Sequence, residues 1–179
     1  SLNTGEVLGL VGESGSGKTT LGRTIIRLTN QDSGKIIFNS LDISNLSKSA
    51  MKKVRKDMQI IFQDPFGSLN PRHSIEHIIG EPLLVHNYAN YNEIKKRILQ
   101  LLDQVGLPSE SMKLHPHEFS GGQRQRIAIA RAIALKPKFL IADEAVSALD
   151  VSIQSQILNL ISDLVKEYNI SMIFISHDL

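Results

Sequence analysis

Residues 12–19 hold the clearest chemical pattern in the chain, Gly12-Glu13-Ser14-Gly15-Ser16-Gly17-Lys18-Thr19. They fit G-x-x-x-x-G-K-[ST] between a strand-like run, 7–11, and a helical pattern, 19–28. Glycines let successive N–H groups turn toward one anion, and a helix N-terminus adds partial positive charge. We expect Lys18 to reach the β- and γ-phosphates and the Thr19 hydroxyl to ligate Mg²⁺. The loop predicts nucleoside triphosphate binding but leaves GTPase, kinase and ATPase open.

Two carboxylates, Asp143 and Glu144, follow the apolar run 139–142. Asp143 is placed at the carboxyl end of a strand, where a second Mg²⁺ partner is needed. Glu144 would orient or deprotonate water, which a phosphate-transferring enzyme acting on water requires. The alternative is a solvated acidic turn without a chemical role. This alternative is less favoured because the same chain also has the phosphate loop.

A second helix start carries Ser120-Gly121-Gly122-Gln123, about a hundred residues after the first. A small hydroxyl and two glycines at a helix N-terminus are suited to an anion. One γ-phosphate could then lie between two copies of the chain facing each other. A simple N-capped helix is the alternative, and taken by itself it is favoured. We expect Arg124, Arg126 and Arg131 to brace this helix.

Alternating strand and helix patterns predict an α/β fold of one domain for the 179 residues. The apolar runs 7–11, 35–38, 58–62, 139–142 and 172–175 are typical of strands buried on both faces of a parallel sheet. Helical patterns cover 92–105, 123–134 and a stripe from Ile153 to Leu164, with Asp150 or Ser152 as its N-cap. No convincing buried strand occurs between 66 and 118, so 66–120 is expected to be an inserted helical subdomain.

Composition excludes several classes of protein. Lys and Arg total 20 against 18 Asp and Glu, so no nucleic-acid partner is expected. The absence of Cys excludes disulfides, thiol catalysis and Cys-ligated zinc. The apolar runs are far shorter than the roughly 20 residues that span a bilayer. We interpret the basic run 48–56 as a solvated face, rather than a lipid or nucleic-acid patch. A metal site at His115 and His117 is not favoured, because no third ligand is nearby in the sequence.

Taken in order, these motifs resemble the ATPase domain of ABC transporters. GESGSGKT resembles its Walker A motif, FLIADE its Walker B motif and FSGGQ its signature motif, which usually has Leu in place of Phe119. Gln63 is similar to the Q-loop glutamine, residues 147–150 to the D-loop, and His177 to the switch histidine. The resemblance implies a P-loop NTPase core with a mainly parallel sheet flanked by helices.

The family works as a head-to-tail pair of ATPase domains with two ATP molecules between them. The resemblance implies that Thr19 and Gln63 ligate Mg²⁺ with support from Asp143, that Glu144 polarises water, and that His177 contacts the γ-phosphate. Phosphate contacts are implied for Gly12, Ser14, Gly15, Ser16, Gly17, Lys18, Thr19 and Thr20 in one domain, and for Ser120, Gly121, Gly122 and Gln123 facing the opposite ATP. Asp150 is expected at the interface of the pair.

The implied partners are a second ATPase domain, the same chain or a sister subunit, and transmembrane permease subunits. A substrate-binding protein would act indirectly, and the chain would lie peripherally on the cytoplasmic face of the cell membrane. Residues 63–72, 79–83 and 116–119 resemble the branch that serves oligopeptide and dipeptide importers, which includes nickel and glutathione importers. A soluble ABC ATPase and a nucleotide-gated assembly module with negligible turnover are the alternatives.

Two departures from the family pattern carry expectations. Ala145 stands where the family usually has Pro, so we expect a looser turn at Glu144 and slower hydrolysis. No aromatic residue for stacking adenine occurs in 1–4, and His177 is the third residue from the end of the sequence. We therefore expect a domain truncated at both ends, with lowered affinity for ATP.

Overall fold

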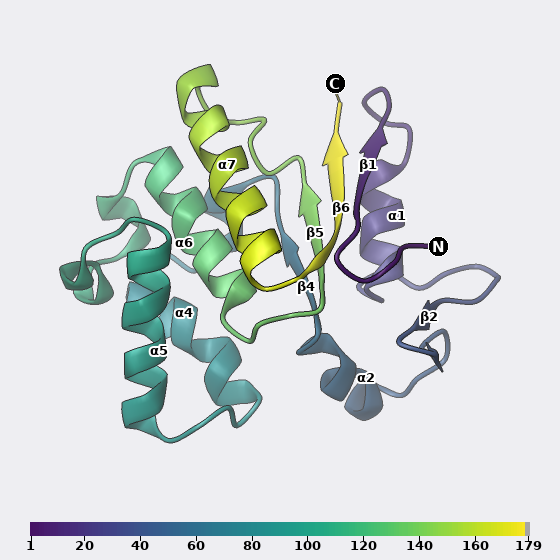
Figure 1. Ribbon diagram of the computed structural model, residues 1–179, viewed down its shortest axis with the longest axis horizontal. Helices are drawn as coiled ribbons and strands as arrows, with labels where there is room; N and C mark the ends of the chain where they lie inside the picture. The colour runs from purple at the N-terminus through teal and green to yellow at the C-terminus, as the bar shows by residue number, and fades with distance from the viewer. Residues whose placement is uncertain (178–179) are drawn as a thin grey trace.

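Four parallel strands form the central sheet of the computed structural model, which describes residues 1–177. They are β1 (Val7–Val11), β4 (Met58–Ile61), β5 (Phe139–Asp143) and β6 (Ser171–Ser176), in the spatial order β1-β6-β5-β4 (Figure 1). Each connection runs through helices, as parallel strands require. The predicted α/β fold with a parallel sheet is confirmed.

Helices cover both faces of the sheet because side chains alternate along each strand. On β5, Leu140 and Ala142 join the larger apolar core, whereas Phe139 and Ile141 join the smaller one. The larger core is built with α4 (Ile75–Val85), α5 (Tyr91–Gln104), α6 (Gly121–Ile133) and α7 (Val151–Glu167). The smaller core holds Ile26, which follows α1 (Lys18–Ile25), and Met51 of α2 (Lys48–Arg55).

The segment between β4 and α6 contains helices and, among its described residues, no strand. It holds α3 (Pro65–Ser68), α4, α5 and the two 3₁₀ turns η1 (Ser109–Lys113) and η2 (Pro116–Glu118). Helices α4, α5 and α6 lie together beside the sheet in Figure 1. The apolar faces of α4 and α5 pack against α6, so this segment is anchored to the same core that covers the sheet.

The prediction of a sheet strand at 35–38 is wrong. Only Ile37–Phe38 is extended, and this short strand, β2, pairs antiparallel with β3 (Leu41–Asp42) outside the main sheet. Asn39 and Ser40 between them have φ values of 47° and 63°, the left-handed region. Two left-handed residues make a tight hairpin turn, so the chain folds back locally before it can reach the sheet.

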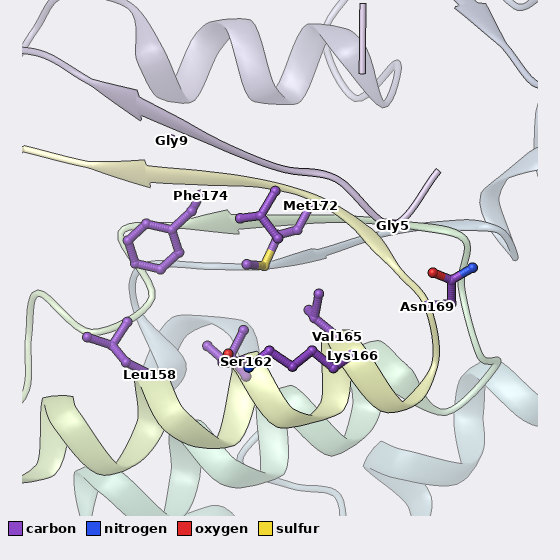
Figure 2. A pocket seen from close by; sticks show the side chains of 11 residues that line it. Gly5, Gly9, Leu158, Ser162, Val165, Lys166, Asn169, Met172 and Phe174 are labelled. Carbon is purple, nitrogen blue, oxygen red and sulfur yellow. The ribbon is translucent and has the colours of Figure 1, made fainter. Parts of the chain in front are cut away.

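The prediction that the apolar runs are buried on both faces is wrong for β1. Val7 and Leu8 are 50% and 46% exposed, although they point to opposite faces. Within the described chain β1 pairs only with β6, and a cavity of about 610 Å³ lies between these strands and α7 (Figure 2). Leu158, Met172 and Phe174 give this cavity a mainly apolar lining.

Helix α2 is an element that the sequence patterns did not predict, because the basic run obscures its short apolar face. The Ser47 hydroxyl accepts a hydrogen bond from Ala50 N, which caps the helix. Met51 is buried beneath it. The cations Lys48, Lys52, Lys53, Arg55 and Lys56 are all exposed, in agreement with a solvated face.

A buried arginine, Arg97, joins α5 to the end of α6. It is 6% exposed, and its Nε and Nη2 donate to the carbonyls of Ala134 and Ile133, both at 3.3 Å. Its Nη1 donates to the Tyr168 hydroxyl, also at 3.3 Å. The last carbonyls of a helix have no partner within the helix, so Arg97 satisfies groups that burial would otherwise leave unpaired.

We expect Arg97→Met to lower the free energy of unfolding by about 2 kcal/mol, since it leaves buried carbonyls without a donor. Tyr168→Phe removes only one contact of the guanidinium and should cost about 1 kcal/mol. Denaturant unfolding of both variants checks this. A methionine variant as stable as the parent chain would show that the carbonyls find other donors.

Candidate functional site

The parallel register brings the carboxyl ends of the four strands to one edge of the sheet. Val11 pairs with Ser176, Asp143 with Ile175, and Ile61 with Ala142, so the carboxyl ends of the strands are level. The residues that follow these ends line a pocket of about 550 Å³. Its lining comprises Glu13, Ser14, Gln63, Glu144, Ser147, Ala148 and His177. Crevices at the carboxyl ends of parallel strands are where α/β proteins bind ligands.

The phosphate loop has the backbone that its glycines predict. Gly15 and Gly17 have φ values of 83° and 92°, and Gly17 is the N-cap of α1. These angles are easy only for glycine. The buried Lys18 ammonium donates to the carbonyls of Gly12 at 2.6 Å and Glu13 at 2.8 Å. The Lys18 side chain therefore folds back over the loop. A bound anion would accept the hydrogen bonds that the ammonium now donates to these carbonyls.

Thr19 and Asp143 meet although 124 residues separate them in the sequence. The Thr19 hydroxyl donates to Asp143 Oδ1 at 2.8 Å, and Asp143 is only 2% exposed. Asp143, Phe139 and Ile141 occupy alternate positions along β5, so their side chains point to the same face of the sheet. Helix α1 packs on this face. Hydroxyl and carboxylate oxygens are the hard donors that Mg²⁺ prefers. The pair therefore fits a Mg²⁺ site next to the phosphate loop.

Gln63 and Glu144 form a second polar pair across the pocket. Gln63 Nε2 donates to Glu144 Oε2 at 2.8 Å, which leaves the amide oxygen of Gln63 available as an acceptor or ligand. Glu144 has a φ of 47°, an uncommon left-handed conformation for a side chain of this size. Its N–H donates to Ile175 O at 3.1 Å, which ties the turn after β5 to β6. Such strained residues cluster at functional sites.

Ser147 belongs to the D-loop-like segment 147–150, but the sequence patterns predicted no role for it beside Gln63 and Glu144. Its hydroxyl donates to the Glu144 carbonyl at 3.0 Å and lies 3.4 Å from Gln63 Nε2, from which it accepts. It thereby braces both members of the Gln63–Glu144 pair. The available signal was its place three residues after Glu144, from which a serine hydroxyl can reach back to a backbone carbonyl.

The SGGQ segment, residues 120–123, does not line this pocket in the described chain. The Ser120 hydroxyl accepts from Gln123 N at 3.3 Å, and Gln123 Oε1 accepts from Ser120 N at 2.9 Å. This reciprocal pair is a capping box, the arrangement of an N-capped helix. An anion role for the segment stays a prediction that requires a second copy of the chain.

Two further predicted site residues, Thr20 and Asp150, lie at or near helix starts. Thr20 is exposed on α1, and its carbonyl accepts from the Thr24 hydroxyl at 2.8 Å. Asp150 rather than Ser152 is the N-cap of α7, and its exposed carboxylate makes no capping hydrogen bond. Asp150 therefore keeps its carboxylate free of the helix it precedes.

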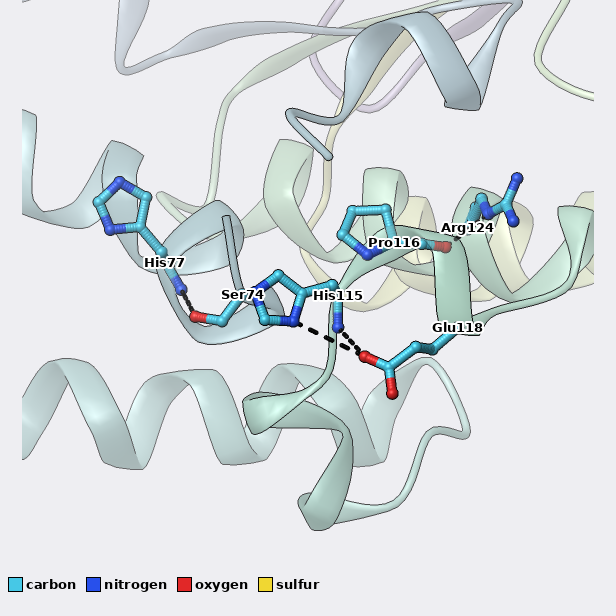
Figure 3. A network of polar contacts seen from close by, with 6 residues as sticks. All are labelled: Ser74, His77, His115, Pro116, Glu118 and Arg124. Carbon is cyan, nitrogen blue, oxygen red and sulfur yellow. Dashed lines mark hydrogen bonds and ion pairs between the residues drawn. The ribbon is translucent and has the colours of Figure 1, made fainter. Parts of the chain in front are cut away.

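The predicted bracing of α6 by arginines is confirmed. Arg124 Nε donates to Pro116 O at 2.7 Å (Figure 3). Arg126 Nη1 donates to Val105 O at 2.8 Å, and Arg131 Nη1 donates to Ser68 O at 2.5 Å. Arg131 is largely buried, and burial lowers the pKa of its guanidinium. The Arg124 guanidinium also lies 3.7 Å from the ring centre of Phe66, which is 63% exposed. This contact joins α6 to α3, the helix that starts two residues after Gln63.

The histidines next to the SGGQ segment have partners of their own. His115 N donates to Glu118 Oε2 at 2.7 Å, and its ring nitrogen lies 3.7 Å from the same oxygen (Figure 3). The His115 and His117 rings stack at 5.8 Å. No group of three or more His, Cys, Asp or Glu side chains that could hold a metal ion occurs among residues 1–177.

The sequence is similar to proteins of known family. The profile of the ABC transporter family matches residues 1–147. Over 180 residues the chain is 55% identical to the oligopeptide transport ATP-binding protein AppF of Bacillus subtilis strain 168, covering 100% of this chain and 55% of that protein. It is 54% identical over 175 residues to the glutathione import ATP-binding protein GsiA of Pectobacterium atrosepticum, covering 98% and 28%. It thus spans about half of the first relative and about a quarter of the second.

Solved structures of the same architecture superpose on nearly the whole chain. The ATP-binding cassette MJ0796, solved as a dimer in a post-hydrolysis state bound to ADP and Pi, matches with a TM-score of 0.88 and 29% identity, covering 99% of this chain and 77% of that one. CbiO1 from Clostridium perfringens matches with a TM-score of 0.87 and 31% identity, covering 99% and 69%. With its P-loop NTPase fold and these matches, the chain belongs to the ABC transporter family, as an ATP-binding domain.

Proposed function

We propose that this chain hydrolyses ATP to drive an importer of oligopeptides or dipeptides, as one member of a head-to-tail pair of ATPase domains. The observation that carries the ATPase proposal is the Gln63–Glu144 pair beside the phosphate loop, since a carboxylate held there can act on water. The import proposal is supported by the names of two relatives, which concern oligopeptide transport and glutathione import.

Phosphate binding would begin with an exchange of partners at Lys18. The ammonium now donates to two loop carbonyls, and phosphate oxygens would replace them with stronger, charge-assisted hydrogen bonds. Helix α1 starts at the end of the same loop and adds the partial positive charge of a helix N-terminus. Binding therefore requires little rearrangement of the backbone.

Mg²⁺ fits the oxygen donors on the sheet side of the loop. Thr19 and Asp143 would hold it, and Gln63 would supply its free amide oxygen. Bound there, the ion would neutralise charge that develops on the transferred phosphate. Gln63 could keep its Nε2 bond to Glu144 in this role, which would hold the carboxylate beside the ion.

Glu144 would orient the attacking water and accept its proton, while His177, which lines the same pocket, would contact the γ-phosphate. Ser147 would hold the Glu144 turn through its carbonyl. The SGGQ segment would act on the ATP of the partner domain, with Asp150 at the interface of the pair. The dimeric state of the MJ0796 structure supports such a pair.

Coupling to transport would involve permease subunits and, indirectly, a substrate-binding protein. Among residues 1–177 no helix is both long and apolar enough to cross a membrane. We therefore propose that the chain binds peripherally, at the cytoplasmic face, to subunits that cross it. The partner domain would be a second copy or a sister subunit.

We expect Glu144→Gln to lower the steady-state rate of ATP hydrolysis at least ~100-fold, because an amide cannot accept the proton from water. ATP affinity should stay close to that of the parent chain, and ATP-dependent pairs should accumulate. Phosphate release and light scattering measure the two effects, with Glu110→Gln, exposed on η1, as the matched control. Equal, negligible release of phosphate by the parent chain and by Glu144→Gln, measured with the permease subunits present, would favour a nucleotide-gated assembly module.

We expect Thr19→Val to weaken ATP binding at least ~10-fold in Mg²⁺ and to change it little in EDTA, because the hydroxyl serves the ion rather than the phosphates. Calorimetric titrations with and without Mg²⁺ separate the two cases. Thr24→Val, on the same helix, should bind like the parent chain under both conditions. An equal loss with and without Mg²⁺ would contradict the assignment of the Thr19 hydroxyl to the ion.

A further inference from the structure

Gly122 in the SGGQ segment faces a side chain of its own chain at very short range. A Cβ atom at this position would lie 2.7 Å from Ile153 Cγ2, far inside van der Waals contact. At the neighbouring Gly121 a Cβ would lie 3.5 Å from Leu149 Cδ2, an ordinary contact distance. The two adjacent glycines therefore differ in the space around them. Of the two, only Gly122 lies where a Cβ atom does not fit.

Ile153 cannot easily move out of the way. Its Cγ2 methyl is attached directly to Cβ, and a β-branched residue in a helix has one strongly preferred rotamer. Ile153 also lies in the first turn of α7, where its N–H donates to Asp150 O at 2.9 Å. The side chain is half-buried and packs against the larger apolar core. An alanine at 122 would therefore push the two helices apart.

This contact joins two segments that the sequence motifs treat separately. Gly122 lies in the first turn of α6, two residues after Ser120, whereas Ile153 lies in the first turn of α7, three residues after Asp150. Gly121 beside Leu149 makes a second, looser contact between the same segments. The Ile153 methyl in the space left by Gly122 therefore sets how the start of α6 sits on the start of α7.

We infer that Ile153 is a positioning residue: its methyl, seated against Gly122, fixes the SGGQ segment and residues 147–150 as one rigid unit. The lack of a side chain at Gly122 makes room for the Ile153 methyl of the same chain. This packing does not depend on what the SGGQ segment contacts in a partner domain. The consequence for pairing and turnover rests on the proposed function, because both segments would face the partner domain. The packing itself does not depend on that function.

The first experiment measures thermal unfolding of the full chain. Gly122→Ala should lower the melting temperature by at least ~4 °C, since overpacking strains rigid neighbours. Gly121→Ala is the matched control and should leave it unchanged or raise it, because its Cβ has room. Adding Ile153→Ala to Gly122→Ala should recover most of the loss. A double variant as unstable as Gly122→Ala would overturn the inference, and so would equal losses at both glycines.

The second experiment asks whether Ile153 positions the motifs rather than only stabilising the fold. In the Glu144→Gln background, Ile153→Ala should weaken ATP-dependent pairing at least ~10-fold, while a single chain binds ATP as before. Ile153→Val keeps the Cγ2 methyl and the branch at Cβ, and it should pair like its parent. Pairing that is unchanged in Ile153→Ala would overturn the positioning role.

The two experiments separate this inference from the proposed function. Absence of hydrolysis and of ATP-dependent pairs in the parent chain would refute the proposed function. The melting temperatures of the glycine variants would still test the packing. Normal hydrolysis in the parent chain together with no rescue by Ile153→Ala would refute the packing alone.

Discussion

The level carboxyl ends of β1, β6, β5 and β4 are the constraint on which the site depends. Hydrogen bonding between parallel strands sets the register of Val11, Ser176, Asp143 and Ile61. The residues that follow these ends must then emerge side by side. Because the register fixes where each strand ends, the phosphate loop, Gln63, Glu144 and His177 meet although they lie far apart in the sequence.

Polar groups at this edge satisfy one another. Lys18 donates to loop carbonyls, Thr19 to Asp143 and Gln63 to Glu144. Unpaired buried donors are costly, so a ligand must offer better partners than these. A polyanion with a divalent cation does so, since charge-assisted bonds are shorter and stronger than bonds to neutral carbonyls. The internal bonds thus favour highly charged ligands over neutral ones.

Helix α6 connects this edge to the rest of the molecule. Its start is capped by its own residues and packed on α7, and Arg124 links it to α3 through Phe66. Its end is capped by Arg97 from α5. A helix held at both ends moves as a body, so a displacement of α3 or α7 would be passed to the SGGQ segment rather than absorbed within α6.

Motifs that act through their own backbone were determined by the sequence. The phosphate loop needs glycines and a helix start at fixed spacing, and Ser120 with Gln123 caps the helix it begins, so both could be recognised locally. Only the tertiary structure decided the hairpin at 37–42, the exposure of β1, the bracing by Ser147 and the close approach of Gly122 to Ile153. Periodicity reports which faces are apolar, but the neighbour that each face meets depends on chain reversals and contacts between residues far apart in sequence.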